Sequence, residues 1–154
     1  MRLALDEARR CEETGDVPVG AVVARGHEVI AAAGNGRERF QDPTAHAEML
    51  ALRDAARREG SWRLDGCTLV VTLEPCAMCA GAIVLARVDR LVVGTMDPKA
   101  GFAGSLGDLV RDPRLNHRVE LTAGVMDEES SGLLRSFFRA RRSERRQSSE
   151  GSST

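Results

Sequence analysis

Aromatic side chains and net charge are both scarce in this chain of 154 residues. It has no Tyr, one Trp and four Phe, which argues against a broad platform for stacking nucleic-acid bases. The net charge is −1, so no overall basic field points to a nucleic-acid partner. No apolar run is long enough to cross a membrane, and the N-terminus lacks a signal-peptide core. We therefore expect a cytoplasmic protein with no membrane partner.

The C-terminus differs in composition from the rest of the chain. Residues 143–154 are mostly Ser, Arg, Glu and Gly, without a large apolar side chain to offset the entropy lost on ordering. We expect one folded domain over residues 1–142 and a disordered polar tail over residues 143–154. Arginines cluster between residues 135 and 146, and this cluster fits a solvated helix end about as well as it fits RNA binding.

Helical and strand patterns alternate along the sequence, as they do in α/β proteins. Strand patterns occupy five segments: 17–24, 28–33, 67–73, 90–93 and 118–121. Helical patterns occupy a second set: 3–13, 45–59 with Thr44 as cap, 75–86, 105–110, and a final segment capped by Asp127. The first two strands predict an antiparallel hairpin, whereas the last two are predicted to be parallel because a long connection separates them. Together these elements predict an α/β fold with three layers, α/β/α, in which a five-stranded mixed sheet is the middle layer.

Four cysteines are present: Cys11, Cys67, Cys76 and Cys79. In a cytosolic chain a close Cys-x-x-Cys pair indicates metal or redox chemistry rather than a disulfide framework. Cys11 lies in a helical pattern and Cys67 opens a strand pattern, so we expect both to be buried thiols.

A second group of residues makes the metal interpretation specific. Cys76 and Cys79 lie three residues apart at a predicted helix start, which suits two ligands of one tetrahedral zinc ion. His46 lies in the first turn of the preceding helix, and strand-to-helix junctions converge at the carboxyl edge of such a sheet. We predict that His46 is the third ligand and that the fourth position holds a water whose pKa zinc lowers to about 7. Glu48 is predicted to move protons beside the metal without binding it.

Two other interpretations of the cysteine pair stay open. A structural zinc site would need a fourth protein ligand, for which Cys11, Cys67, His27 and His117 are the Cys and His residues left. A redox dithiol would leave His46 and Glu48 without a role.

The pattern H-x-E followed by P-C-x-x-C, at residues 46–48 and 75–79, is a known signature of zinc-dependent nucleobase deaminases. Beyond it, the sequence resembles the bacterial tRNA-specific adenosine deaminases of the cytidine/deoxycytidylate deaminase superfamily. The resemblance runs from residue 17 to about residue 142. Five segments carry it: 17–22, 43–48, 72–82, 97–105 and 116–120.

The resemblance implies a cytidine-deaminase-like fold and a homodimer with one Zn²⁺ per subunit. The implied reaction converts adenosine to inosine at the wobble position of a tRNA anticodon, with zinc-activated water attacking C6 and Glu48 shuttling protons. The resemblance also implies that Asn35 contacts the base, that Val19 and Ala45 wall the pocket, and that Asp97 touches the ribose. From the residues alone, Asn35 could equally shape a turn between two glycines.

Two alternative functions share the metal motif. A deaminase of a free base or nucleotide, of the guanine or cytosine type, would need a closed pocket, for which Phe137 and Phe138 could form a lid. A structural-zinc RNA-binding module without catalysis would need Cys67 or His117 to complete a four-ligand site.

Overall fold

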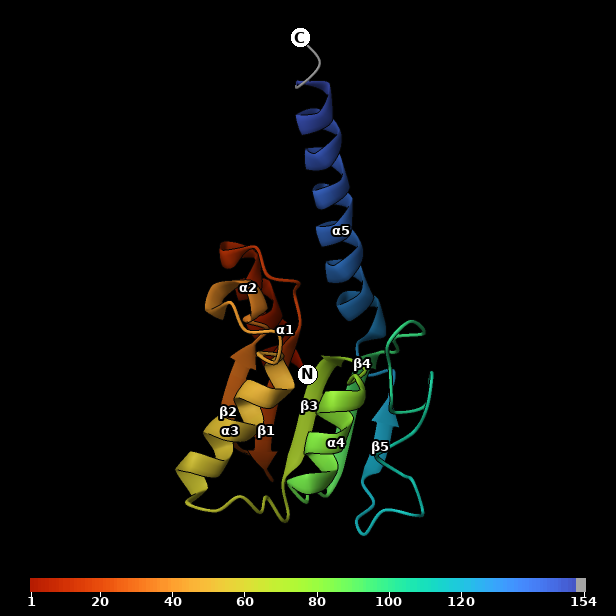
Figure 1. The fold of residues 1–154 in the computed structure, drawn as a ribbon. Coiled ribbons are helices and arrows are strands. Elements are labelled where there is room, and N and C mark those ends of the chain that lie inside the picture. Colours follow the sequence, from red (N-terminus) through yellow and green to blue (C-terminus); the bar gives the residue numbers. More distant parts are fainter. Residues whose placement is uncertain (152–154) are drawn as a thin grey trace.

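The computed structural model describes residues 1–151, and its five strands form a single mixed sheet in the order β2-β1-β3-β4-β5 (Figure 1). The strands are β1 (Gly20–Arg25), β2 (Glu28–Gly34), β3 (Thr68–Leu73), β4 (Arg90–Thr95) and β5 (Glu120–Ala123). Strand β1 pairs antiparallel with β2 and β3, whereas β4 pairs parallel with β3 and β5. The predicted hairpin and the predicted parallel pair are both confirmed.

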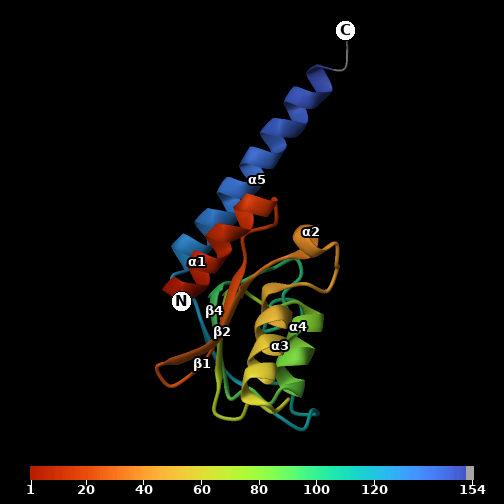
Figure 2. The ribbon, with the colours of Figure 1, turned by 90° about the vertical axis from the view of Figure 1, so that its left-hand side faces the viewer.

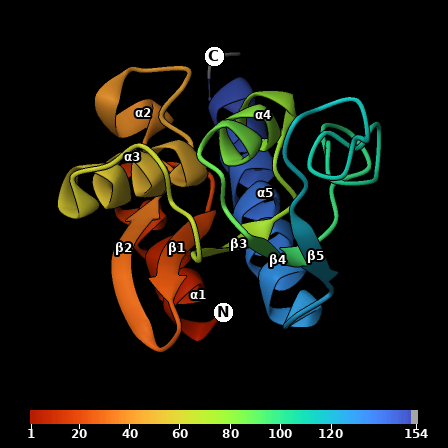
Figure 3. The same ribbon diagram turned by 90° about the horizontal axis from the view of Figure 1, so that it is seen from below.

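Helices cover both faces of this sheet, which confirms the three-layer prediction. They are α1 (Arg2–Arg10), the 3₁₀ helix η1 (Cys11–Thr14), α2 (Arg37–Phe40), α3 (Ala47–Glu59), α4 (Ala77–Leu85) and α5 (Asp127–Glu150). Helices α3 and α4 lie on one face, and α1 and α5 lie on the other (Figures 2 and 3). Within residues 1–151, no helix has the length and apolar character needed to cross a membrane.

The core lies where the central strands are covered on both faces. Leu69 and Val71 of β3 and Leu91 and Val93 of β4 are all fully buried. Parallel strands enclosed in this way are apolar on both sides, and each such side chain contributes roughly 1.5–3 kcal/mol relative to an exposed one. This rigid centre carries the ends of β3 and β4, from which the loops of the site emerge.

Three local predictions were wrong. Residues 105–110 form no helix; this segment folds back in a bridge between Ala103 and Asp108. Thr44 does not cap α3, because its hydroxyl donates to Asp42 and His46 occupies the N-cap position. Asp127 is the first residue of α5 and does not cap it, since Met126, in the left-handed region, occupies the N-cap position.

The C-terminal segment also differs from its prediction. Helix α5 continues through Glu150, so residues 143–150 are helical and exposed (Figure 1). Arg, Glu and Gln have high helix propensity, and extending an existing helix avoids the cost of nucleation. Residues 152–154 of the expected tail lie outside the described residues. The domain limit at residue 142 stays a prediction.

Helix α5 approaches strand β4 closely at Gly94. Ser130, in its first turns, is 1% exposed, and its hydroxyl is the one buried side-chain polar atom in residues 1–151 without a hydrogen-bond partner. Opposite it, a Cβ at Gly94 of β4 would collide with Ser130 Oγ and lie 2.5 Å from the carbonyl oxygen of Thr72. Glycine at position 94 therefore sets how near α5 packs against β4.

We predict that Gly94→Ala lowers the free energy of unfolding by about 1–3 kcal/mol, because the added methyl group overpacks this contact. Gly132→Ala is the matched control in the same helix, since its Cβ would meet only an Arg135 nitrogen at 4.0 Å. That variant should be neutral or stabilising by up to about 1 kcal/mol. Urea denaturation measures both changes, and equal effects would contradict this packing.

Candidate metal centre

Two helix starts meet at one edge of the sheet. Strands β2 and β3 are both antiparallel to β1, so their carboxyl ends share that edge. His46 is the N-cap of α3 and Cys76 is the N-cap of α4, each with extended backbone. Cys79 follows in the first turn of α4. The predicted ligand atoms of His46, Cys76 and Cys79 lie within 4.8 Å of one another.

The spacing of these atoms fits a tetrahedral zinc ion. His46 Nδ1 lies 3.6 Å from Cys76 Sγ and 3.4 Å from Cys79 Sγ. Zinc–sulfur bonds of about 2.3 Å and zinc–nitrogen bonds of about 2.05 Å at a tetrahedral angle require a nitrogen–sulfur separation of about 3.6 Å. One imidazole and two sulfurs are also the ligand types that zinc prefers. The three side chains therefore fit this ion in both distance and chemistry.

Hydrogen bonds among His46, Cys76 and Cys79 link the pKa values of these three side chains. The Cys79 thiol and the His46 imidazole, both hydrogen-bonded to Cys76, lower the pKa of the Cys76 thiol to about 3. The hydrogen bond to Cys76, followed by burial, raises the pKa of the Cys79 thiol. The hydrogen bond to Cys76 likewise raises the pKa of His46. A metal ion takes the place of the protons that these groups share, so metal affinity should fall as the pH is lowered.

Glu48 lies in the first turn of α3, two residues beyond His46, and is 4% exposed. Burial raises the pKa of its carboxyl group, although its own backbone N–H and the neighbouring Cys79 thiol act in the opposite direction. A carboxyl group with a raised pKa can hold a proton closer to neutral pH, which suits a proton carrier. Glu48 is not one of the three residues grouped as metal ligands.

No fourth protein ligand reaches this group within residues 1–151. The thiol of Cys11 donates weakly to the carbonyl oxygens of Glu7 and Val19, and Cys67 Sγ lies 3.4 Å from an Arg25 nitrogen. His117 Nε2 lies 2.7 Å from the carbonyl oxygen of Val88. Three of the four residues considered for a structural zinc site, Cys11, Cys67 and His117, therefore make contacts elsewhere, and the group as described offers three ligands.

A cavity of about 250 Å³ opens beside the metal ligands. Of the residues predicted for the site, it brings together six: Val19, Asn35, His46, Glu48, Cys76 and Asp97. Ala45 is 1% exposed and does not line the cavity. Its carbonyl oxygen instead accepts a hydrogen bond from the Gly36 N–H, which fixes the chain next to Asn35.

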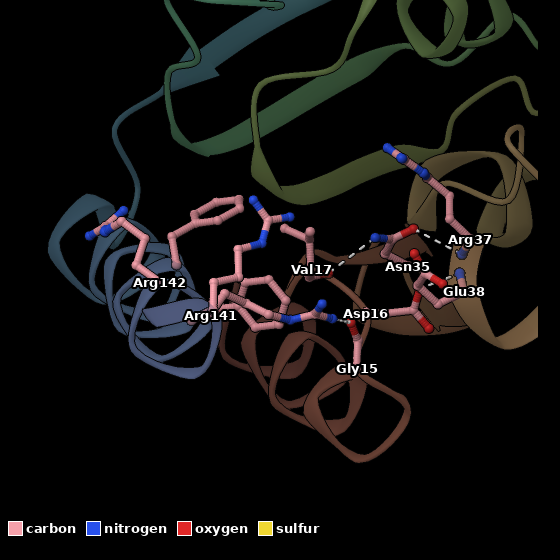
Figure 4. Close-up of a pocket in the computed structure, with 11 residues that line it drawn as sticks. Gly15, Asp16, Val17, Asn35, Arg37, Glu38, Arg141 and Arg142 are labelled. Atoms are coloured by element: carbon pink, nitrogen blue, oxygen red, sulfur yellow. Dashed lines mark hydrogen bonds between the residues drawn. The ribbon is translucent and has the colours of Figure 1, made fainter. Parts of the chain in front are cut away.

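Asn35 makes local hydrogen bonds with both ends of its side-chain amide. Its Nδ2 donates to the carbonyl oxygen of Val17 at 3.2 Å, and its Oδ1 accepts from the Arg37 N–H at 3.3 Å (Figure 4). The turn-shaping interpretation therefore holds. Each end of an amide has capacity for one further hydrogen bond, so the contact with a base stays compatible with these partners.

Sequence reasoning missed several residues that line this cavity. Glu74 and Arg37 are two of them. Phe138, which the sequence suggested only as part of a lid over a free-base pocket, reaches the cavity from α5. Glu74 directly precedes Pro75 in the metal motif, so its position along the chain was a usable signal. Arg37 had none, because only the fold places its helix beside the metal ligands.

A second cavity of about 270 Å³ adjoins the first and shares Val17, Asn35, Arg37 and Phe138 with it (Figure 4). Three arginines of α5 line it: Arg141, Arg142 and Arg145. Arg141 donates to the carbonyl oxygen of Gly15, and its guanidinium lies over the Phe137 ring. The cluster at the C-terminus therefore has one arginine that joins α5 to η1 and two others on the cavity rim.

We predict that the purified protein binds one zinc ion per chain, and that His46→Ala and Cys76→Ser each abolish tight binding because two ligands remain. Cys11→Ser is the control, because a serine hydroxyl can also donate to the carbonyl oxygens that the thiol contacts. Inductively coupled plasma mass spectrometry after dialysis gives the stoichiometry. Retention of zinc by the two ligand variants would disprove the assignment.

Comparison with known proteins agrees with the geometry in indicating a zinc-binding site. The family described as the cytidine and deoxycytidylate deaminase zinc-binding region matches residues 1–95. The tRNA-specific adenosine deaminase of Bacillus subtilis is 49% identical over 146 residues, which cover 95% of this chain and 91% of the relative. That of Aquifex aeolicus is 45% identical over 139 residues, covering 90% and 91%.

Solved structures of deaminases are also similar to this chain. One, from a study of A-to-I editing by tRNA:A34 deaminases at the wobble position of transfer RNA, is 43% identical with a TM-score of 0.84, covering 87% of this chain and 97% of that one. A guanine deaminase from Nitrosomonas europaea is 27% identical with a TM-score of 0.72, covering 87% and 80%. With its metal-ligand group, its fold and these relatives, the chain belongs to the tRNA-specific adenosine deaminase family.

Proposed function

We propose that the protein converts adenosine to inosine at the wobble position of a tRNA anticodon by hydrolytic deamination. One observation carries the proposal: the three metal-ligand side chains and the buried Glu48 gather at the start of two helices, where His46, Cys76 and Glu48 line one cavity. The names of the relatives from Bacillus subtilis and Aquifex aeolicus support tRNA adenosine as the substrate.

The chain's own residues account for the proton transfers. Zinc, when held by His46, Cys76 and Cys79, supplies a water that is acidic enough to attack C6 of adenine near neutral pH. The Glu48 carboxylate accepts a proton and returns it to N1 of the ring, and a second transfer reaches the departing amine. Burial of Glu48 favours holding the proton between these transfers. The products are inosine and ammonia.

The substrate contacts follow from the cavity and from the family. Asn35, oriented by Val17 and Arg37, presents a remaining donor and acceptor to the purine edge. Val19 lines the cavity as an apolar wall, and Ala45, which the resemblance also assigns to the wall, is buried and holds the Gly36 N–H next to Asn35. Asp97 touches the ribose of the target nucleotide. Such a pocket suits a base turned out of an anticodon loop.

The RNA contacts, the oligomeric state and the cellular location are proposed from the arginines of α5 and from the family resemblance. The arginines of α5 beside the second cavity favour contact with RNA phosphates next to the target nucleotide. The protein acts as a homodimer, as the family resemblance implies, and each subunit holds one zinc ion. A tRNA substrate places it in the cytoplasm, without a membrane partner.

A second candidate is the deamination of a free purine. The similarity to a guanine deaminase at 27% identity favours it, as does the metal motif that all these enzymes share. A free base fills a pocket without contacts to flanking nucleotides. The two candidates therefore differ in whether the rest of the RNA contributes to turnover.

We predict that the zinc-loaded protein forms inosine in an anticodon stem-loop with a wobble adenosine. Free guanine, adenine and cytosine should turn over at least about a hundredfold less efficiently, because they lack the phosphate and ribose contacts. Mass analysis of digested nucleosides measures the product. The matched control is a stem-loop with guanosine at the wobble position. Efficient turnover of free guanine with no inosine in RNA would favour the second candidate.

We predict that Glu48→Gln retains zinc but lowers kcat about 10²–10⁴-fold, because the amide cannot accept the proton. The change preserves side-chain shape, so a fall in zinc content is not expected. Glu120→Gln, an exposed acid on β5, is the control and should keep wild-type activity. Near wild-type kcat in Glu48→Gln would show that another group moves the proton.

A further inference from the structure

The carboxylate of Glu74 has an unusual set of partners. It follows the last residue of β3, is 2% exposed, and pairs with no basic side chain in residues 1–151. All its partners lie in one loop. Oε1 accepts from the Asp97 N–H at 2.8 Å and from the Ser105 hydroxyl, and Oε2 accepts from the N–H groups of Ala103 and Ser105 at 3.0 Å each.

These four hydrogen bonds leave the carboxylate with no free capacity. A carboxylate offers about four lone-pair sites, and each of these donors occupies one. Glu74 lines the cavity, but its oxygens are therefore engaged and do not serve a substrate. Burial opposes a charge at this position, yet the hydrogen bonds from Ser105, Asp97 and Ala103 lower its pKa below the ordinary value.

The loop is closed tightly around this side chain. A Cβ at Gly101 would collide with all three atoms of the Glu74 carboxyl group, so only glycine lets the loop backbone approach so closely. The Phe102 N–H also donates to the carbonyl oxygen of Pro75 at 2.8 Å. Residues 97–105 are thus joined to the chain segment that leads directly into the metal ligand Cys76.

The same loop carries Asp97 and Ala100 into the cavity. Asp97 Oδ1 accepts from the N–H groups of Lys99 and Ala100 at 3.0 and 3.3 Å, which orients its side chain within the loop. Its own N–H is held by Glu74. The position of Asp97 relative to the metal ligands therefore depends on this one hydrogen-bonded carboxylate.

We propose that Glu74 is a positioning residue: it fixes residues 97–105 against the metal-binding turn, so that Asp97 meets the ribose of the target nucleotide. This inference rests on the proposed function, in which Asp97 contacts that ribose. Glu74 acts through Asp97 and takes no part in proton transfer. Its effect falls on substrate affinity and on recognition of the sugar rather than on the chemical step.

Glu74→Gln tests this directly, because the amide keeps the shape of the side chain but not its four acceptor sites. When the amide oxygen faces Ala103 and Ser105, the amide nitrogen faces the Asp97 N–H, and two donors oppose each other. Asp97 is then released, while the opposite amide orientation would free Ala103 and Ser105. We expect KM for the wobble-adenosine stem-loop to rise about tenfold or more, with kcat changed by less than about threefold and zinc content unchanged.

The sugar supplies a readout that a general loss of stability would not give. A stem-loop with 2′-deoxyribose at the target adenosine should be a poorer substrate than the all-ribose stem-loop for the wild type. In Glu74→Gln this preference should shrink. In an Asp97→Ala background, adding Glu74→Gln should change KM by less than about threefold, because both act on one contact. Ser105→Ala removes a single donor and should shift KM in the same direction by a smaller factor.

The outcomes separate the two proposals. A wild-type protein that makes no inosine in any stem-loop disproves the proposed function. If the wild type is active, three results would each overturn the inference: a wild-type KM in Glu74→Gln, a loss confined to kcat, or effects of Glu74 and Asp97 that simply multiply. If Glu74→Gln fails to fold, Ser105→Ala decides: an unchanged KM and unchanged sugar preference would reject the role.

Discussion

The convergence of two helix starts on one small volume is the constraint on which this structure depends. The chain must bring an imidazole from the start of α3 and two sulfurs from the start of α4 to within 4.8 Å of each other. It does so by placing β2 and β3 in the same direction on either side of β1, so that both helices begin at one edge of the sheet. The extended N-cap residues His46 and Cys76 then point their side chains at the same place. Everything else at the site is arranged around that point.

Two buried glutamates lie on either side of the metal ligands, and their surroundings shift the pKa of each carboxyl group in opposite directions. Glu48, on the α3 side, is buried, and burial outweighs the hydrogen bonds to its carboxyl group, so this group favours the protonated form more than a solvated one does. Glu74, on the α4 side, is similarly shielded from solvent but accepts four hydrogen bonds, which stabilise its charged form. Two acids of the same type therefore have different properties because of their surroundings. One suits proton transfer, and the other holds a loop in place.

Much of this could be predicted from the sequence, because the signals were local. Strand and helix periodicity predicts the five-stranded sheet, and the spacing of His46, Glu48, Cys76 and Cys79 predicts the metal ligands and the neighbouring acid. The parts that failed depend on hydrogen-bond partners that periodicity and helix propensity do not reveal. Residues 105–110 have a helical pattern, but the N–H groups of Leu106 and Leu109 donate to the carbonyl oxygens of Gly101 and Phe102, in the loop that Glu74 holds. Thr44 is a good capping residue, yet Asp42 takes its hydroxyl. The cavity walls supplied by Arg37 and Phe138 depend on the whole fold.

X-ray absorption spectroscopy at the zinc edge counts the metal ligands themselves. We expect two sulfur neighbours at about 2.3 Å and two lighter neighbours at about 2.0–2.1 Å, one from an imidazole and one from solvent. The solvent neighbour should exchange for an added competing anion. A third sulfur or a second imidazole would disprove the three-ligand site, since the position needed for the reaction would then be closed by the protein.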